Sequence, residues 1–298
     1  MWREGLGENC EFGRYHPWVI TCYYVLTIGI TMFSLSPWFL AATAVFAWIY
    51  AVLLKGKKAV RGNLIMIVTV AGLMTLINTF FTHNGATVLF YINHNRVTLE
   101  AFAYGFCAAV MLISVFLWFE SFQVLMTSDK LIYLFGRLLP VIGLVISMIF
   151  RFIPLLRNRY EEIVMGQKCM GRSGQKGLVS RVRQLTKQVS ILIAWSLEAS
   201  IENADSMTAR GYGLHGRTSF HLFHIERRDL LALLYLAVTG IPVIVGGVLG
   251  KTTMTFYPKL VWTWPDLPVL IFYLLLLLFP LVIDLSGEYR WKKSLSKM

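Results

Sequence analysis

The chain has few charged residues and especially few acidic ones. Only 15% of its 298 residues are charged while 56% are hydrophobic, and 28 Lys and Arg stand against 16 Asp and Glu. A soluble domain rarely reaches such an apolar composition, and the apolar residues form blocks long enough to cross a bilayer. An excess of Lys and Arg is typical of the cytoplasmic loops of membrane proteins. The composition therefore predicts an all-α polytopic membrane protein. Its partner is expected to be the lipid bilayer, and we expect no nucleic-acid partner.

Cysteine is scarce, and the short sequence motifs of enzymes are absent. The four cysteines are scattered without a CxxC pair, which argues against a metal centre or a disulfide framework. No HExxH or GxSxG string is present. Three residues separate Gly246 from Gly250, whereas a P-loop needs four and a preceding strand. The short group His221, His224 and Glu226 is interpreted as an interfacial loop. We therefore expect no cofactor, no metal and no catalytic residue.

Six apolar blocks are long enough to span about 30 Å of hydrocarbon, which takes roughly 20 helical residues. They cover residues 17–35, 38–54, 63–81, 101–126, 229–249 and 267–284. With both termini in the cytoplasm, 25 of the 28 Lys and Arg lie on the inner side and only Arg96, Lys251 and Lys259 lie outside. The opposite orientation would invert this ratio. The charge distribution therefore predicts cytoplasmic termini.

This topology divides the chain into three parts. Residues 1–126 hold four spans, residues 127–225 form a cytoplasmic segment, and residues 226–298 hold two more spans. Residues 138–150 are almost wholly apolar and could be a seventh span. Crossing there would place eight positive charges in one short external loop. We interpret them as a helix at or below the inner interface.

The cytoplasmic segment is predicted to contain one short and two long helices. The short one, about 129–135, is amphipathic and is expected to end at Gly136. The long ones cover about 139–171, with a kink at Pro154, and about 178–210. On the second long helix an apolar stripe recurs at steps of four and three: Leu178, Val182, Leu185, Val189 and Leu192. The residues expected to face water are Arg181, Arg183, Gln184, Lys187 and Gln188. At about 45 Å each, these helices exceed what a loop between spans needs.

Each long helix is predicted to end at an arginine that glycines follow at once. The two helix ends are Gly171-Arg172-Ser173 and Ala209-Arg210-Gly211. The last turn of a helix exposes unpaired carbonyl groups, and glycine closes it in left-handed geometry. An arginine there presents a planar fork of donors that carboxylates on a partner could bind bidentately. Simple C-capping by a basic residue is the alternative for either site.

Two further patterns lie on the second long helix. A row of small residues would let another helix approach closely, either from the same chain or from a partner subunit: Ser196, Ser200 and Ala204. A row of acidic residues could form a proton relay if it were buried: Glu198, Glu202 and Asp205. Pairing with nearby arginines, or a place beside the second helix end, is the interpretation we favour for the carboxylates.

Several strings of this segment match one family, and the match covers most of the chain. They are Ser128-Asp129-Lys130-Leu131, 146–148 with 151–154, Gln167-Lys168 ahead of Arg172, and 205–212. The chain resembles the T component of energy-coupling factor (ECF) transporters, the membrane scaffold of vitamin and metal-ion importers. The first arginine motif departs from the family pattern because it reads Gly-Arg-Ser rather than Ala-Arg-Gly. Its arginine is kept, so the family role is carried over to Arg172 as well as to Arg210.

The resemblance implies a scaffold function in the plasma membrane of a prokaryote. The two long helices would cross and couple the membrane part to the motor. Their arginine ends would dock into grooves on two cytoplasmic ABC-type ATPase subunits, and a separate small membrane subunit would capture the substrate. Two other classes compete: an integral membrane enzyme, and a self-contained secondary transporter. The latter predicts internal repeats and charges within spans, and apart from Glu120 the spans hold few ionisable residues.

Overall fold

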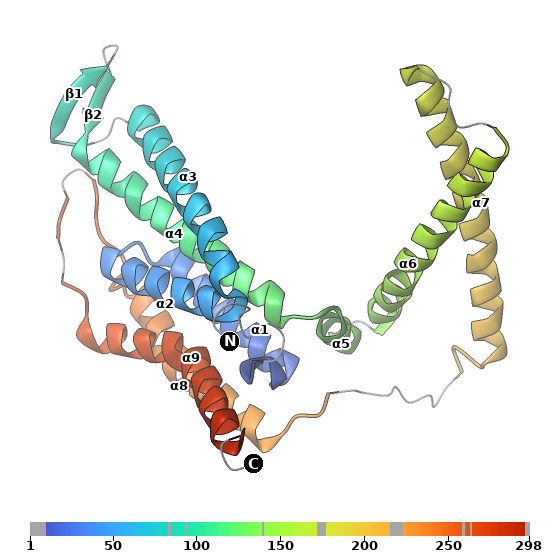
Figure 1. The fold of residues 1–298 in the computed structure, drawn as a ribbon. Coiled ribbons are helices and arrows are strands. Elements are labelled where there is room, and N and C mark those ends of the chain that lie inside the picture. Colours follow the sequence, from blue (N-terminus) through green and yellow to red (C-terminus); the bar gives the residue numbers. More distant parts are fainter. Residues whose placement is uncertain are drawn as a thin grey trace. The chain divides into compact units, whose positions relative to one another are not determined.

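The computed structural model describes residues 10–82, 85–92, 95–138, 140–171, 177–214, 223–257, 260–262 and 264–295. Its helices are α1 (Pro17–Phe33), α2 (Pro37–Lys55), α3 (Lys57–Phe81), α4 (Leu99–Leu125), α5 (Ser128–Leu138), α6 (Pro140–Cys169), α7 (Leu178–Ala209), α8 (Arg227–Val248) and α9 (Leu267–Leu295) (Figure 1). The chain divides into two compact units. Unit 1 comprises residues 1–131 and 223–298, and unit 2 comprises residues 132–222.

Among the described residues, six helices are long and apolar enough to cross a membrane. They are Pro37–Lys55, Val60–Phe81, Leu99–Leu125, Val141–Cys169, Arg227–Val248 and Leu267–Trp291. Five coincide with expected spans, and the all-α polytopic membrane class is confirmed. The remaining expected span, α1, is a shorter apolar helix of 17 residues, about 25 Å long. The sixth long helix is instead α6, whose first half is the apolar stretch that we interpreted as interfacial.

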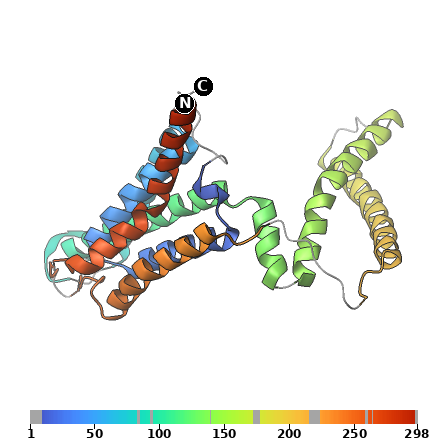
Figure 2. The same ribbon diagram turned by 90° about the horizontal axis from the view of Figure 1, so that it is seen from below.

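Aromatic side chains fill the core of unit 1, whose helices Figure 2 shows from a second side. Tyr23, Tyr24 and Trp118 are buried, and both tyrosine rings meet the indole edge-on, with centroids 5.8 Å and 5.9 Å away. Edge-to-face pairs suit the quadrupoles of aromatic rings, and each ring buries on the order of 150–250 Å². This packing joins α1 to α4. Because the core is mainly apolar, its few polar contacts decide how the helix ends are held.

The N-terminal segment, residues 10–16, is tied to two distant helices by buried carboxylates. Asp284 of α9 accepts hydrogen bonds from the Phe12 backbone N–H at 2.7 Å and from the Tyr50 hydroxyl at 3.0 Å. Asp229 of α8 accepts one from the His16 backbone N–H at 3.1 Å. These contacts place the start of α1, the start of α8 and the later part of α9 at one end of unit 1. That arrangement agrees with helices that alternate in direction.

A β-hairpin that the sequence analysis did not predict connects α3 to α4. Strands β1 (Val88–Ile92) and β2 (Asn95–Thr98) pair antiparallel, from Val88 opposite Thr98 to Ile92 opposite Asn95. The buried Glu100 carboxylate accepts the Thr87 backbone N–H at 3.1 Å, next to the hairpin. Two short strands between long apolar helices carry too little periodicity to stand out in the sequence.

Unit 2 departs from the expected helix boundaries at one glycine. α5 continues through Gly136, where we expected it to end, and reaches Leu138. Gly136 lies against Gly143 of α6, where a side chain on Gly143 would collide with the Gly136 backbone. The glycine therefore permits a close approach of two helices rather than ending one. α6 runs on through Pro154, and the bend expected there stays a prediction.

Candidate functional site at two helix ends

The end of α7 is closed by a glycine directly after Arg210. Arg210 is the C-cap residue, and Gly211 follows with φ of 75°. The Gly211 N–H donates to the Thr208 carbonyl and the Tyr212 N–H to the Met207 carbonyl, both at 3.0 Å. This pair of hydrogen bonds is the Schellman motif, which satisfies carbonyls that the helix leaves unpaired. The backbone around Arg210 is thus fixed by hydrogen bonds that do not involve its side chain.

The Arg210 side chain is exposed at this end. It forms no ion pair with any residue in the described part of the chain. Its guanidinium group therefore keeps its planar set of five donors for other partners. A cation at the negative end of a helix dipole is also favourably placed. Capping is carried out by Gly211, so the capping alternative does not require the arginine side chain.

The end of α6 is closed differently from the way we expected. α6 ends at Cys169, and Gly171 adopts φ of 72° with its N–H donating to the Lys168 carbonyl at 3.0 Å. The left-handed glycine therefore precedes Arg172, whereas we expected the glycines after it to end the helix. Arg172 and Ser173 lie outside the described residues. The two arginines thus differ in register: Arg210 comes directly before its left-handed glycine and Arg172 directly after.

Polar residues make the contact where α6 and α7 cross (Figure 1). Gln188 of α7 is buried and accepts a hydrogen bond from the Tyr160 hydroxyl of α6 at 3.4 Å. The expectation that Gln188 faces water was therefore wrong. The Arg159 guanidinium lies 5.4 Å from the centre of the Trp195 ring and pairs with Glu162 at 2.6 Å. A hydrogen bond and a cation–π contact thus link the two long helices.

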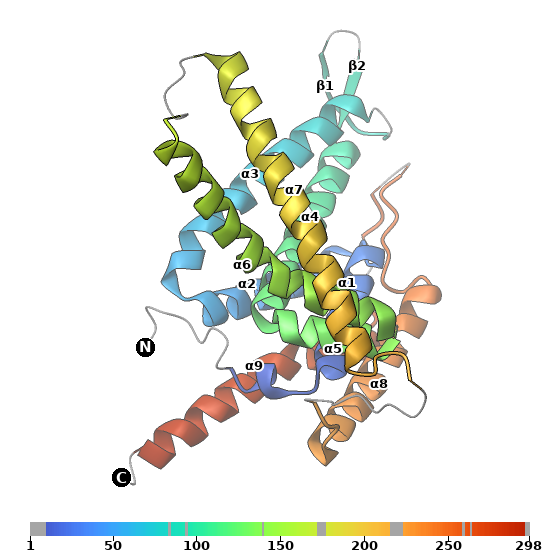
Figure 3. The same cartoon turned by 90° about the vertical axis from the view of Figure 1, so that its right-hand side faces the viewer.

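Most of the apolar stripe of α7 is left open by this arrangement, although its fifth residue, Leu192, is half-buried. Leu178 is 81% exposed, Val182 62% and Leu185 46%. Helix α6 contacts the neighbouring face that carries Gln188 and Trp195, because one crossing can cover only one side of a helix. Uncovered apolar residues in this number are typical of surfaces that bind another protein or lipid. Figure 3 shows α7 as one continuous helix, and the stripe lies in its first half.

The two other patterns on α7 are also largely exposed, although Ser196 is half-buried. Ser200 and Ala204 are exposed, and the hydroxyls of Ser196 and Ser200 donate to carbonyls of their own helix at 2.9 Å and 2.6 Å. This places Ser200 and Ala204 outside the contact with α6, so the contribution of this row to a partner contact stays a prediction. Glu198, Glu202 and Asp205 are exposed as well, which removes the buried setting that a proton relay needs.

The glycine-rich stretch at the end of α8 is a third helix end of the same type. Gly250 has φ of 74°, and the Lys251 N–H donates to the Gly246 carbonyl at 3.0 Å. The Lys251 ammonium pairs with Asp266 at 2.7 Å. The backbone N–H groups that a phosphate loop would present therefore close a helix here. Across the described ranges, no group of three His, Cys, Asp or Glu is arranged to hold a metal, while His221 falls outside those ranges.

Sequence reasoning missed two residues that make polar contacts away from these helix ends. Tyr160 looked like an ordinary helix residue, although its hydroxyl is the partner of Gln188. Lys130 belongs to the string that carried the resemblance, and its ammonium group donates to the carbonyls of Gly13 at 2.6 Å and Leu125 at 2.8 Å. Both could be found only once distant parts of the chain were placed side by side.

Comparisons with known proteins show which family the chain resembles. The family model described as CbiQ, cobalt transport protein, matches residues 14–222, well over half of the chain. A protein of Streptococcus equi subsp. equi named energy-coupling factor transporter transmembrane protein EcfT is 29% identical over 183 residues, 56% of this chain and 66% of its own length. A protein of the same name from Listeria innocua is 31% identical over 178 residues, 56% of this chain and 67% of its own. The chain therefore aligns with about two thirds of these relatives.

Proposed function

This chain belongs to the CbiQ family of cobalt transport proteins, and we propose that it is the transmembrane T component of an energy-coupling factor transporter. In this role it would be a non-catalytic scaffold in the cell membrane of a prokaryote, with cytoplasmic termini. It would couple ATP hydrolysis by two cytoplasmic ABC-type ATPase subunits to the movement of a separate small membrane subunit. That subunit would capture a vitamin or a metal ion. The names of the relatives support the assignment to such a transporter.

The observation that carries this proposal is the construction of unit 2. Two long helices cross through polar contacts, leave apolar residues uncovered, and each end at a glycine-closed turn beside an arginine. Fixed helices of this length can transmit a displacement from one end to the other, because a helix is a stiff element. The apolar stripe of α7 would then contact a membrane partner, and the small residues Ser196, Ser200 and Ala204 would allow a close helix contact there.

Arg172 and Arg210 are proposed to be the main ATPase contacts, each engaging one subunit. Ala209 and Gly211 would set the backbone beside Arg210, and Gly171 and Ser173 would do so beside Arg172. Because the register of the two arginines differs, we infer that the two docking contacts are not geometrically equivalent. The Arg210 donors would meet carboxylates of the partner as bidentate, charge-assisted hydrogen bonds.

The test replaces the arginines in the assembled complex. Truncating one member of a buried, hydrogen-bonded charge pair at an interface costs about 2–5 kcal/mol. That equals a loss of about 30-fold to several thousand-fold in affinity at 1.4 kcal/mol per tenfold. Arg210→Ala and Arg172→Ala should each weaken ATPase co-purification and uptake, the double variant should release both ATPase subunits, and Arg210→Lys should restore only part of the binding.

Arg183→Ala provides the matched control. Arg183 is also an exposed arginine on α7 but lies far from its C-terminal end. This variant should retain both ATPase subunits and normal uptake. All variants should insert in the membrane to the same level. If the double variant still co-purifies with both ATPases and transports normally, the helix ends are capped turns without a docking role and the proposal fails.

A further inference from the structure

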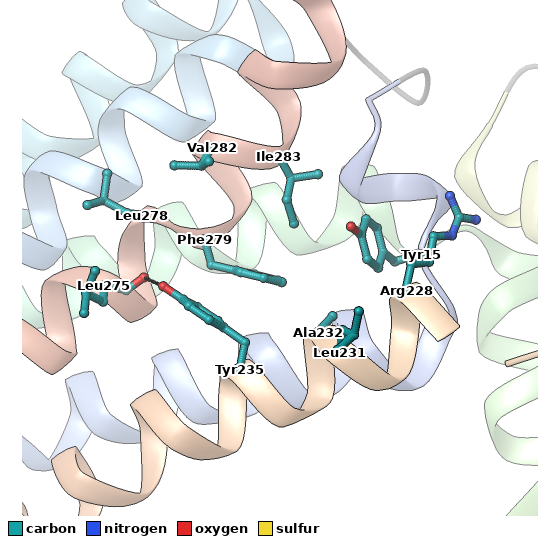
Figure 4. Close-up of a pocket in the computed structure, with 10 residues that line it drawn as sticks. All are labelled: Tyr15, Arg228, Leu231, Ala232, Tyr235, Leu275, Leu278, Phe279, Val282 and Ile283. Atoms are coloured by element: carbon teal, nitrogen blue, oxygen red, sulfur yellow. Dashed lines mark hydrogen bonds between the residues drawn. The ribbon is translucent and has the colours of Figure 1, made fainter. Parts of the chain in front are cut away.

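A pocket of about 430 Å³ lies within unit 1, between α8, α9 and the N-terminal segment (Figure 4). Most of its wall is apolar and is supplied by the two helices. Tyr15 and Arg228 lie together at one end of the pocket, and Tyr235 lies toward the other. None of these residues belongs to the helix ends proposed to dock the ATPases.

The pocket becomes more apolar along the direction of α8. Arg228 is at the start of that helix, and Tyr235 follows seven residues later, about 10 Å further along the axis. The Tyr235 ring stacks on Phe279 of α9 with centroids 5.0 Å apart. Its hydroxyl donates to the Leu275 carbonyl at 2.9 Å, so this polar group is already satisfied. The inner part of the pocket therefore presents aromatic and aliphatic surface without an open polar group from Tyr235.

Arg228 is held in place at the polar end. Its Nε pairs with Glu226 at 2.9 Å, a terminal nitrogen donates to the Arg14 carbonyl at 3.3 Å, and the guanidinium carbon lies 5.4 Å from the centre of the Tyr15 ring. These contacts orient the side chain and leave its other N–H groups for a ligand. Arg227 directly precedes it in the chain and is not among the residues that line the pocket.

We propose that this pocket binds an anionic phospholipid, with its phosphate at Arg228 and an acyl chain over Tyr235 and Phe279. A cation and an aromatic ring at the end of a spanning helix lie at headgroup level. The apolar interior lies between two helices that span the hydrocarbon. A planar guanidinium group recognises phosphate through charge-assisted hydrogen bonds. A free phosphate would use only the Arg228 end, whereas a phospholipid matches both the cation and the apolar length.

The test measures lipid binding to the full chain, purified in detergent, by native mass spectrometry. Phosphatidylglycerol and phosphatidylcholine are added at equal concentration, and we expect phosphatidylglycerol to be retained preferentially. Arg228→Gln should lower its occupancy about tenfold, the effect of losing one strong charge-assisted contact. Arg227→Gln removes the same charge from a residue outside the pocket and should change occupancy less than about twofold. Glycerol phosphate, which has no acyl chain, should not bind.

A second variant tests the apolar half independently. Leu231 lines the pocket and is 64% exposed, so Leu231→Trp places bulk in the pocket without overfilling the core. Its phosphatidylglycerol occupancy should fall although Arg228 is intact, while its unfolding temperature stays that of the wild type. Equal losses in the two arginine variants would show a general charge effect and overturn the proposal. So would full phosphatidylglycerol binding by Leu231→Trp, or strong binding of glycerol phosphate.

Discussion

The buried carboxylate of Asp284 gives the sharpest stability prediction. Asp284→Ala removes the acceptor for the Phe12 N–H and for the Tyr50 hydroxyl, both at 3.0 Å or less. Both donors lie in buried residues, and leaving a buried donor unpaired costs about 1–3 kcal/mol. The expected loss is therefore about 2–6 kcal/mol, with the N-terminal segment released first. Asp284→Asn keeps an acceptor for Phe12 and offers an N–H to the Tyr50 oxygen, so its loss should be clearly smaller.

The same substitution at a surface carboxylate is the control. Asp266 pairs with Lys251, but both side chains are more than 40% exposed, so Asp266→Ala should cost at most about 1 kcal/mol. Stability is measured on the detergent-purified chain by size-exclusion chromatography after heating, and release of the N-terminal segment by limited proteolysis. The reasoning is refuted if Asp284→Ala unfolds at the same temperature as Asp266→Ala, or if its N-terminal segment is no more sensitive to protease.

Three further predictions address the topology, a helix end and the absence of a phosphate site. The exposed Cys169 should resist an impermeant maleimide added outside intact cells yet react in opened membranes. Buried Cys10, whose thiol pKa is raised by burial to about 12, should react under neither condition. Labelling of Cys169 from outside would contradict the predicted orientation. Gly211→Ala forces a side chain into φ of 75°, which should lower the stability by about 1–2 kcal/mol and speed hydrogen exchange at the end of α7. Gly166→Ala lies at an open helical position and should have neither effect. Lys251→Ala should leave the ATPase rate of the complex within about twofold, because Lys251 pairs with Asp266 beside a closed helix end. A loss beyond about a hundredfold would instead indicate a phosphate site.

Much of the helical fold could be predicted from local sequence. Hydropathy alone gave five of the six long apolar helices, because a span must satisfy its backbone internally and present apolar side chains to lipid. The bounds of α7 were predicted to within a residue, since glycine after the helix marks a left-handed closure whatever surrounds it. The placement of the lysines and arginines gave an orientation that stays a prediction. These features depend on residues close together in the chain or on their sum.

Where several residues carried the same local signal, only the tertiary structure decided which of them closes a helix or becomes buried. Several glycines surround Arg172, and the backbone uses Gly171 to close α6, which the sequence could not single out. Gln188 lies off the apolar stripe and was expected to face water, yet the crossing with α6 buries it against Tyr160. Asp284 and Phe12 are 272 residues apart in the chain, so no local pattern relates them. Composition and periodicity determine which helices form, whereas the polar contacts between them depend on which faces the folded chain brings together.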